Sequence, residues 1–247
     1  MKLLDELYAY LWPGVTMAEM QRYGNNSNSY VIANALPENR HVIIDPGQVI
    51  NEVGQNCLAR LSLEMKNDSL LMEDVGLIII THSHSDHYAA AEEIKKMSGA
   101  RIAVGKKEDE FTKATGKQML KMFESMGFKI PELKPDLFLN EGDLLLGQNT
   151  VVQILLTPGH SPGHLGIYWP SKKVYIAGDL IFYGSTGRVD FPGGSARLLK
   201  ESIEKVAQLD IEYILTGHQY GGPGIIEGAD QVKANFEFIR KNVFPYL

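Results

Sequence analysis

The stretch Thr81-His82-Ser83-His84-Ser85-Asp86-His87-Tyr88 decides how the rest of the chain is organised. It directly follows residues 74–80, an almost unbroken apolar run with the length and β-branched content of a buried strand. It precedes residues 89–96, whose pattern predicts a helix. Three His and one Asp within six residues, on a loop between a strand and a helix, form a pattern typical of a metal site.

The spacing within this loop indicates that it can serve two metal ions. His82 and His84 lie two residues apart, so an extended backbone points both side chains the same way. Asp86 and His87 follow after the chain has turned, so they point elsewhere. The alternative is a polar loop with coincidental histidines, but three of the seven His in the chain occur here.

A second strand end supplies a further histidine. Residues 155–164 read Leu-Leu-Thr-Pro-Gly-His-Ser-Pro-Gly-His, and their Pro and Gly force a turn that exposes His160. His164 would share a metal ion with His160 only on a helix, which Pro162 disfavours. We therefore expect His160 to be a ligand and His164 to orient the loop through hydrogen bonds.

Two more strand ends complete the candidate set. Asp179 follows a strand-like run and a Gly, a position that suits a carboxylate whose two oxygens bridge two cations. His218 follows the apolar run 211–215. Gly-Asp alone is also a common turn, but its place in the chain after the earlier histidines favours a ligand.

These motifs together resemble the metallo-β-lactamase superfamily. The resemblance is carried by the His-x-His-x-Asp-His loop, by Thr157-Pro158-Gly159-His160 and by the later, isolated Asp179 and His218. It implies an α+β fold, a four-layer αβ/βα sandwich of two mixed β-sheets with helices on the outer faces and the site at the strand ends along one edge. We expect a single domain over residues 1–247, with a helical insertion at about 106–129.

The resemblance also implies a role for each candidate residue. It places His82, His84 and His160 on one metal ion, Asp86, His87 and His218 on the other, and Asp179 between them. Asp45 would support the metal loop from behind, the alternative being an ordinary Asp-Pro-Gly turn. Mixed nitrogen and oxygen ligands without thiolate suit two divalent ions, with Zn expected first and Fe or Mn as alternatives. Asp86 and Asp179 are the catalytic candidates, since a hydroxide bridging the metals would attack the substrate while Asp86 orients the water and handles its proton.

A later stretch resembles one branch of that superfamily, the glyoxalase II and persulfide-dioxygenase branch. Gly187-Arg188-Val189-Asp190-Phe191 follows Asp179 at that branch's spacing, and His218-Gln219-Tyr220 matches its His-x-Tyr. The resemblance implies that Arg188 and Tyr220 contact the substrate. The alternative for Arg188 is a salt bridge to Asp190 or to a neighbouring carboxylate.

The expected function is a metal-dependent hydrolase of a small ester, thioester or lactone, similar to glyoxalase II. The alternative is a mononuclear Fe(II) persulfide dioxygenase that uses His82, His160 and Asp179 as a two-His-one-carboxylate triad. A phosphodiesterase or nuclease is less favoured, because the formal net charge of −6 disfavours a broad nucleic-acid surface. The expected partner is a small, anionic molecule rather than a nucleic acid or a membrane.

The composition indicates an ordinary globular chain, with 44% hydrophobic and 22% charged residues. A lone cysteine, Cys57, excludes an internal disulfide and fits a reducing compartment. No run reaches the roughly 20 apolar residues that span a bilayer. The N-terminus carries Asp5 and Glu6 within its apolar stretch and lacks the apolar region of a signal peptide, so we expect a cytoplasmic protein.

Three local patterns lead to further expectations. Residues 15–23 predict a strand, and residues 51–66 predict a helix. Within the helical insertion an apolar stripe recurs at helical spacing, formed by Met119, Met122, Phe123 and Met126. Such a stripe packs on the core or on a second subunit, which allows a homodimer, or it forms a wall of the substrate pocket.

Overall fold

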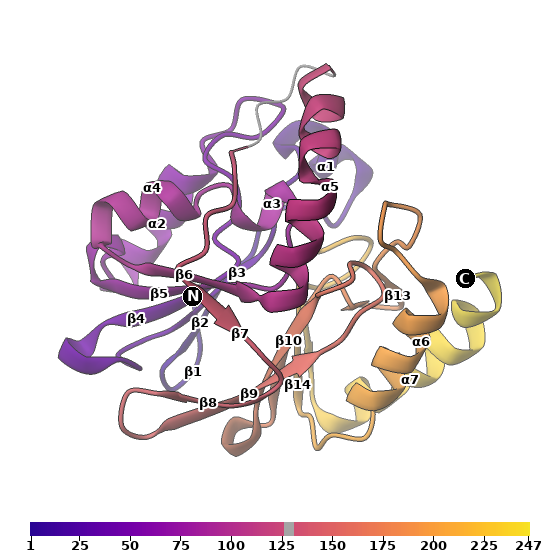
Figure 1. Ribbon diagram of the computed structural model, residues 1–247. Helices are drawn as coiled ribbons and strands as arrows, with labels where there is room; N and C mark the ends of the chain where they lie inside the picture. The colour runs from indigo at the N-terminus through magenta and orange to yellow at the C-terminus, as the bar shows by residue number, and fades with distance from the viewer. Residues whose placement is uncertain (126–130) are drawn as a thin grey trace.

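The architecture is the four-layer sandwich expected from the sequence (Figure 1). This computed structural model describes residues 1–125 and 131–247, and it describes the side chains of the helix that ends at Ser125 only as far as Thr115. Two mixed sheets face each other in the centre, with helices on both outer faces. Within the described residues, no helix is long and apolar enough to cross a membrane.

The first sheet comes from the N-terminal half of the chain. Its strand order is β1-β2-β3-β4-β5-β6-β7, antiparallel from β1 to β4 and parallel from β4 to β7. The strands are β1 Lys2–Leu4, β2 Leu7–Tyr10, β3 Ser29–Ile32, β4 His41–Ile44, β5 Val75–Ile80, β6 Arg101–Gly105 and β7 Leu137–Leu139.

The second sheet comes from the C-terminal half and has the order β15-β14-β11-β10-β9-β8. Its neighbours are antiparallel except for the parallel pair β11 and β14. The strands are β8 Gly142–Leu146, β9 Thr150–Leu156, β10 Leu165–Trp169, β11 Val174–Gly178, β14 Tyr213–Thr216 and β15 Ile225–Glu227, and a separate small hairpin joins β12 Ile181–Phe182 to β13 Ser185–Thr186.

Helices cover the outer face of each sheet. Helices α2 and α4 pack on the first sheet, and α6 and α7 pack on the second, whereas α5 rises from the end of β6 (Figure 1). The helices are α1 Met17–Tyr23, α2 Cys57–Asn67, α3 Ser85–Tyr88, α4 Ala91–Ser98, α5 Lys106–Ser125, α6 Ala196–Val206 and α7 Ala229–Asn242. Short 3-10 turns occupy Pro37–Asn39, Met72–Asp74, Pro170–Lys172 and Phe244–Tyr246.

The apolar run before the metal loop is explained by burial on both faces of its strand. In β5, Ile79 packs into the core between the two sheets, whereas Ile78 and Ile80 pack under the helices of the first sheet. Successive side chains of a strand point to opposite faces, so a strand buried on both sides reads as continuously apolar. This burial fixes the end of β5, and therefore the start of the metal loop, inside the sandwich.

Two local predictions were wrong. Residues 17–23 form helix α1 rather than a strand, because Thr16 and Glu19 make reciprocal side-chain-to-backbone hydrogen bonds that start a helix. Helix α2 begins only at Cys57, after its cap residue Asn56, and not at residue 51. The helical insertion is helix as far as Ser125, and the apolar stripe from Met119 to Met126 lies outside the described side chains.

Candidate metal centre

The predicted metal-site residues come from four strand ends and meet at one edge of the sandwich. The loop after β5 carries His82 and His84, and the first turn of α3 carries Asp86 and His87. Three further strands end at the same place: His160 follows β9, Asp179 follows β11 and His218 follows β14. The expected set is therefore brought together in space from residues up to 136 positions apart (218 − 82).

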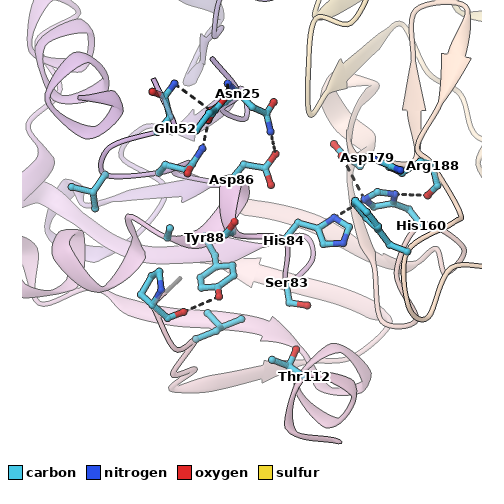
Figure 2. Close-up of a pocket in the computed structure, with 18 of the residues that line it drawn as sticks. Asn25, Glu52, Ser83, His84, Asp86, Tyr88, Thr112, His160, Asp179 and Arg188 are labelled. Atoms are coloured by element: carbon cyan, nitrogen blue, oxygen red, sulfur yellow. Dashed lines mark hydrogen bonds and ion pairs between the residues drawn. The ribbon is translucent and has the colours of Figure 1, made fainter. Parts of the chain in front are cut away.

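Three imidazoles converge in the first group. The Nε2 atom of His82 lies 3.0 Å from Nδ1 of His84, and that same Nδ1 lies 2.9 Å from Nε2 of His160. Figure 2 shows the rings of His84 and His160 side by side, with a dashed line that marks this contact. The extended backbone before α3 points both loop histidines the same way, as the sequence predicted.

The second group lies beside the first. Its Nε2 atoms, from His87 and His218, are 3.2 Å apart, and Nε2 of His218 lies 3.3 Å from Oδ2 of Asp86. His87 is fully buried and His218 nearly so, whereas Asp86 borders the cavity described below. Each group thus has one partly exposed member, His84 in the first and Asp86 in the second, and both of these border the cavity.

Asp179 stands between the two groups, with one oxygen toward each. Its Oδ1 lies 3.3 Å from Nε2 of His87 and 3.6 Å from Nε2 of His218, and its Oδ2 lies 3.5 Å from Nε2 of His160. Oδ1 is buried and has no hydrogen-bond partner among the described residues. A Cβ on Gly217 would come within 2.1 Å of that oxygen, so only glycine leaves room for it. A buried carboxylate oxygen without a donor fits a cation that completes its contacts.

Hydrogen bonds behind the ring of His82 fix which of its nitrogens carries the proton. The hydroxyl of Thr81 donates its only proton to Oδ2 of Asp45 at 2.6 Å, so Nδ1 of His82, 3.0 Å away, must donate to Thr81 Oγ1. Nδ1 of His87 likewise donates to Asp45 Oδ2 at 2.8 Å. In the neutral form of each ring the inward Nε2 therefore carries a lone pair.

The same reasoning holds for the two later histidines, which donate to main-chain carbonyls. Nδ1 of His160 donates to the Arg188 carbonyl at 2.7 Å, and Nδ1 of His218 donates to the Asn26 carbonyl at 3.1 Å. Lone pairs that face each other at such distances repel unless a cation lies between them. Ligands of a tetrahedral cation with bonds of about 2.0–2.1 Å to nitrogen are about 3.3 Å apart, so the donor set fits metal ions.

Burial and charge set the protonation of these groups. Burial lowers the pKa of His84 to about 4 and the pKa of His82 well below its ordinary value, and the neighbouring histidines add to the effect. Burial would also lower the pKa of His87, but the carboxylates of Asp179 and Asp45 hold it well above the ordinary value. For Asp179, burial favours a raised pKa, yet the histidines around it hold that pKa well below its usual range. The carboxylate is therefore ionised and the rings of His82 and His84 are neutral, as metal ligands must be, whereas His87 carries a second proton that a bound ion would displace.

His164 and Asp45 lie behind the site rather than in either group. Nε2 of His164 accepts the backbone N–H of Asp179 at 3.2 Å, and its Nδ1 donates to Thr157 Oγ1 at 2.9 Å. Burial lowers the pKa of His164 to about 3, which keeps the ring neutral. Asp45 accepts from the backbone N–H of Thr81 at 2.8 Å in addition to the two contacts above. Both residues thus contact the backbone or rings of candidate ligands.

A cavity of about 1500 Å³ opens onto the two groups. Arg188 and Tyr220 both line it, but neither is free of other contacts. The Arg188 guanidinium pairs with both carboxylate oxygens of Asp190 and stacks on the ring of Phe191 at 3.9 Å. The ring of Tyr220 stacks on His218, with centroids 4.5 Å apart. The structure therefore contains the salt bridge named above as the alternative for Arg188.

Asn25 is a site residue that the sequence did not reveal, because Gly-Asn-Asn indicates only a turn. Its Nδ2 donates to Oδ2 of Asp86 at 2.6 Å (Figure 2). Its Oδ1 accepts from the Tyr220 hydroxyl at 2.8 Å. Asn25 is itself held by Glu52, which accepts its backbone N–H at 2.6 Å. The carboxylate of Asp86 is therefore oriented by a neutral amide on the open side of the site.

Comparison with known proteins identifies what the chain resembles. The family model described as Metallo-beta-lactamase superfamily matches residues 22–218. The hydroxyacylglutathione hydrolase GloC of Haemophilus influenzae is 33% identical over 192 residues, which cover 73% of this chain and 81% of that protein.

Two solved structures extend the comparison. TTHA1623 in a di-iron-bound form has a TM-score of 0.64 at 27% identity, covering 90% of this chain and 95% of that one. ETHE1 from Myxococcus xanthus has a TM-score of 0.61 at 21% identity, covering 88% of this chain and 86% of that one, and shares the fold.

Proposed function

The chain belongs to the metallo-β-lactamase superfamily, and from that premise we propose that it is a dinuclear metallohydrolase acting on a small thioester, ester or lactone. One observation carries this proposal. Two groups of side chains lie next to each other with their ligand atoms turned inward, and Asp179 directs one oxygen to each. A site for a single ion would leave the second group, Asp86, His87 and His218, without a purpose.

The proposed first site consists of His82, His84 and His160, the second consists of Asp86, His87 and His218, and Asp179 is shared. We expect Zn at both sites, with Fe or Mn as alternatives, because the donors are imidazole and carboxylate without thiolate. Bound ions of this kind lower the pKa of water toward neutrality and stabilise the negative charge that develops on an attacked carbonyl oxygen.

The protein's own contribution begins with Asp86. We assign Asp86 to orient the attacking water and to take its proton, because its carboxylate borders the cavity and lies beside His218. Without a bound ion, burial would raise the pKa of Asp86, but a hydrogen bond from protonated His218 and the charges of His87 and His218 hold it well below its usual range. An ion in the second group would take the place of those protons. The amide of Asn25 keeps one oxygen of Asp86 in place, so that the carboxylate does not rotate when substrate enters.

We propose a thioester of a thiol-containing peptide as the preferred substrate. The relative from Haemophilus influenzae is named a hydroxyacylglutathione hydrolase, and 81% of its length is covered by this chain. We assign Arg188 and Tyr220 to substrate contact at the cavity wall. A substrate carboxylate would have to replace Asp190 as the partner of the guanidinium, a charge-assisted exchange that an anionic substrate can make.

Metal analysis and a substrate panel test the proposal together. Protein purified without added metal should contain about two metal ions per chain, and it should hydrolyse a hydroxyacylglutathione faster than lactones or phosphoesters. One Fe per chain, with oxygen consumption on a persulfide and no hydrolysis, would instead identify the dioxygenase. Cleavage of a phosphoester alone would identify a phosphodiesterase. The Asp179→Ala variant serves as the inactive control in each assay.

A further inference from the structure

Glu108 is a buried carboxylate that joins the two loops of the first histidine group. It lies in the first turn of α5 and is fully buried. Its Oε1 accepts the backbone N–H of Ser83 at 2.9 Å and the Ser83 hydroxyl at 2.6 Å. Its Oε2 accepts the Ser161 hydroxyl and the backbone N–H of Gly163, each at 2.9 Å. One carboxylate oxygen thus holds the loop after β5, and the other holds the loop after β9.

The arrangement requires a carboxylate at this position. Each oxygen faces a backbone N–H, from Ser83 on one side and Gly163 on the other, and a backbone donor cannot reverse its role. A glutamine would turn its NH2 group toward one of the two N–H groups, whichever way the amide is placed. An unpaired buried donor is unfavourable, so the amide is not an equivalent replacement.

Close backbone packing fixes α5 against the same loop. A Cβ on Gly163 would lie 2.1 Å from the backbone nitrogen of Glu108, and a Cβ on Gly105 would lie 2.8 Å from the Gly163 carbonyl oxygen. These contacts do not depend on the carboxylate. They show that the start of α5 is in direct contact with the loop that carries His160.

The two residues that Glu108 holds are direct neighbours of candidate ligands. Ser83 lies between His82 and His84, and Ser161 follows His160. The ligand nitrogens of His84 and His160 are 2.9 Å apart, so a small shift of either loop changes that separation. In the view of Figure 2, Ser83 lies between His84 and Thr112 of α5, and the contacts of Glu108 with Ser83 join the helix to this loop.

We propose that Glu108 is a positioning residue that holds His84 and His160 at the spacing that a cation in the first group requires, and that it connects this group to α5. The helix carries Phe111, Thr112 and Lys113 on the cavity wall, so a substrate that contacts α5 also contacts the element that sets the first group. The inference rests on the metal centre of the proposed function, but it does not depend on which reaction that centre performs.

The test compares Glu108→Gln with Glu110→Gln, a matched change of an exposed glutamate on the same helix. Zn affinity is measured by competition with a chelator, and the Co(II)-substituted proteins are compared by their visible absorption. Loss of an outer contact to a metal site typically costs about 10–100-fold in affinity, so Glu108→Gln should weaken one of the two sites by that factor and change its Co(II) spectrum. Repeating the titration in a His218→Ala background, which keeps only the first group intact, should show the same loss. Glu110→Gln should match the parent in both measurements, and Glu108→Asp should recover part of the affinity.

Two results would overturn the proposal. In the first, Glu108→Gln binds Zn at both sites as tightly as the parent. In the second, Zn affinity falls equally at both sites and the metal-free variant melts at a lower temperature, which would indicate a general loss of stability. If Glu108→Gln does not fold, Ser83→Ala and Ser161→Ala each remove one hydroxyl contact and leave the carboxylate in place. Each should then weaken the first group several-fold, and unchanged affinity in both would refute the role. If the parent binds two ions but hydrolyses nothing in the panel, the proposed reaction is wrong. The ratio of Zn affinities between Glu108→Gln and the parent still decides the role of Glu108.

Discussion

Replacing His164 by alanine should weaken metal binding, although we do not assign His164 as a ligand. Its imidazole is fully buried and accepts the backbone N–H of Asp179 at 3.2 Å. The opposite nitrogen donates to Thr157 Oγ1 at 2.9 Å. Alanine leaves the Asp179 N–H without a partner and opens a space behind it, so the carboxylate that lies between the two groups loses its support.

The size of the effect follows from these contacts. An unsatisfied buried N–H costs about 1–3 kcal/mol, and deletion of a large buried side chain costs about 2–5 kcal/mol. A mid-range loss of about 5 kcal/mol lowers the melting temperature of the metal-free protein by roughly 10–20 °C at about 2–4 °C per kcal/mol. Metal affinity should fall by about 10–100-fold, as expected when an outer contact to a ligand is lost.

His41→Ala is the matched control for this measurement. His41 is also buried, and burial lowers its pKa, so both rings are neutral. It likewise accepts one backbone N–H, from Asn34 at 3.1 Å, but it lies at the opposite end of β4 from Asp45. His41→Ala should therefore lose stability while keeping parent metal affinity in the chelator competition.

Two outcomes would contradict the role given to His164. In the first, His164→Ala melts at a lower temperature but binds both ions as tightly as the parent. In the second, His164→Ala loses one ion entirely while His160→Ala keeps both, which would make His164 the ligand in place of His160. A loss of affinity confined to His164→Ala, with His41→Ala unchanged, would support the hydrogen bond to Asp179 as the cause.

Three further predictions concern the ions and the substrate. Asp179→Ala should lower the metal content and abolish most activity while circular dichroism stays native, because a strand-end carboxylate adds little to the core; two bound ions with near-normal turnover would refute its bridging role. Arg188→Ala should raise KM several-fold for an anionic substrate with kcat little changed, and Arg188→Lys should recover only part of the loss because lysine lacks the planar fork. The control is Arg197→Ala, which removes an exposed arginine paired with Glu201 on α6. Loss of bound metal or of the fold in Arg188→Ala would instead make Arg188 a structural partner of Asp190. Removing the metal ions with a chelator should lower the melting temperature by roughly 8–16 °C, because a ligand at about 1,000 times its Kd stabilises by about 4 kcal/mol; an unchanged melting temperature would argue against ions bound in the folded state.

Strand ends could be predicted from the sequence because each one couples two signals. An apolar run marks a buried strand, and a polar ligand type two or three residues after it marks the sheet edge, as at Ile80 and His82 or at Leu215 and His218. Helix α1 was missed because Thr16 and Glu19 decide it through capping, whereas the residues around them suggest alternation. The prediction of one domain over residues 1–247 stays a prediction.

The outer contacts of the site could not be predicted, because they join residues far apart in the chain. Glu108 stands among the charged residues at the start of a helix, like many surface charges, and only the fold places it against Ser83 and Gly163, 25 and 55 positions away. Asn25 acts on Asp86 across 61 positions. A ligand side chain can be recognised by its type and by its place at a strand end, but a hydrogen bond between distant loops leaves no pattern along the sequence.

The outer contacts also explain why the two groups form one unit. Asp45 accepts from Thr81, whose hydroxyl in turn accepts from His82 of the first group, and it accepts directly from His87 of the second. Asp179 joins the same two groups from the inner side. A displacement of either carboxylate therefore moves ligands of both groups, whereas the contacts of Glu108 reach only the loops of the first. Asp45 and Asp179 thus position ligands of both groups, whereas Glu108 positions ligands of the first group alone. The metal titrations described above can separate these two kinds of effect.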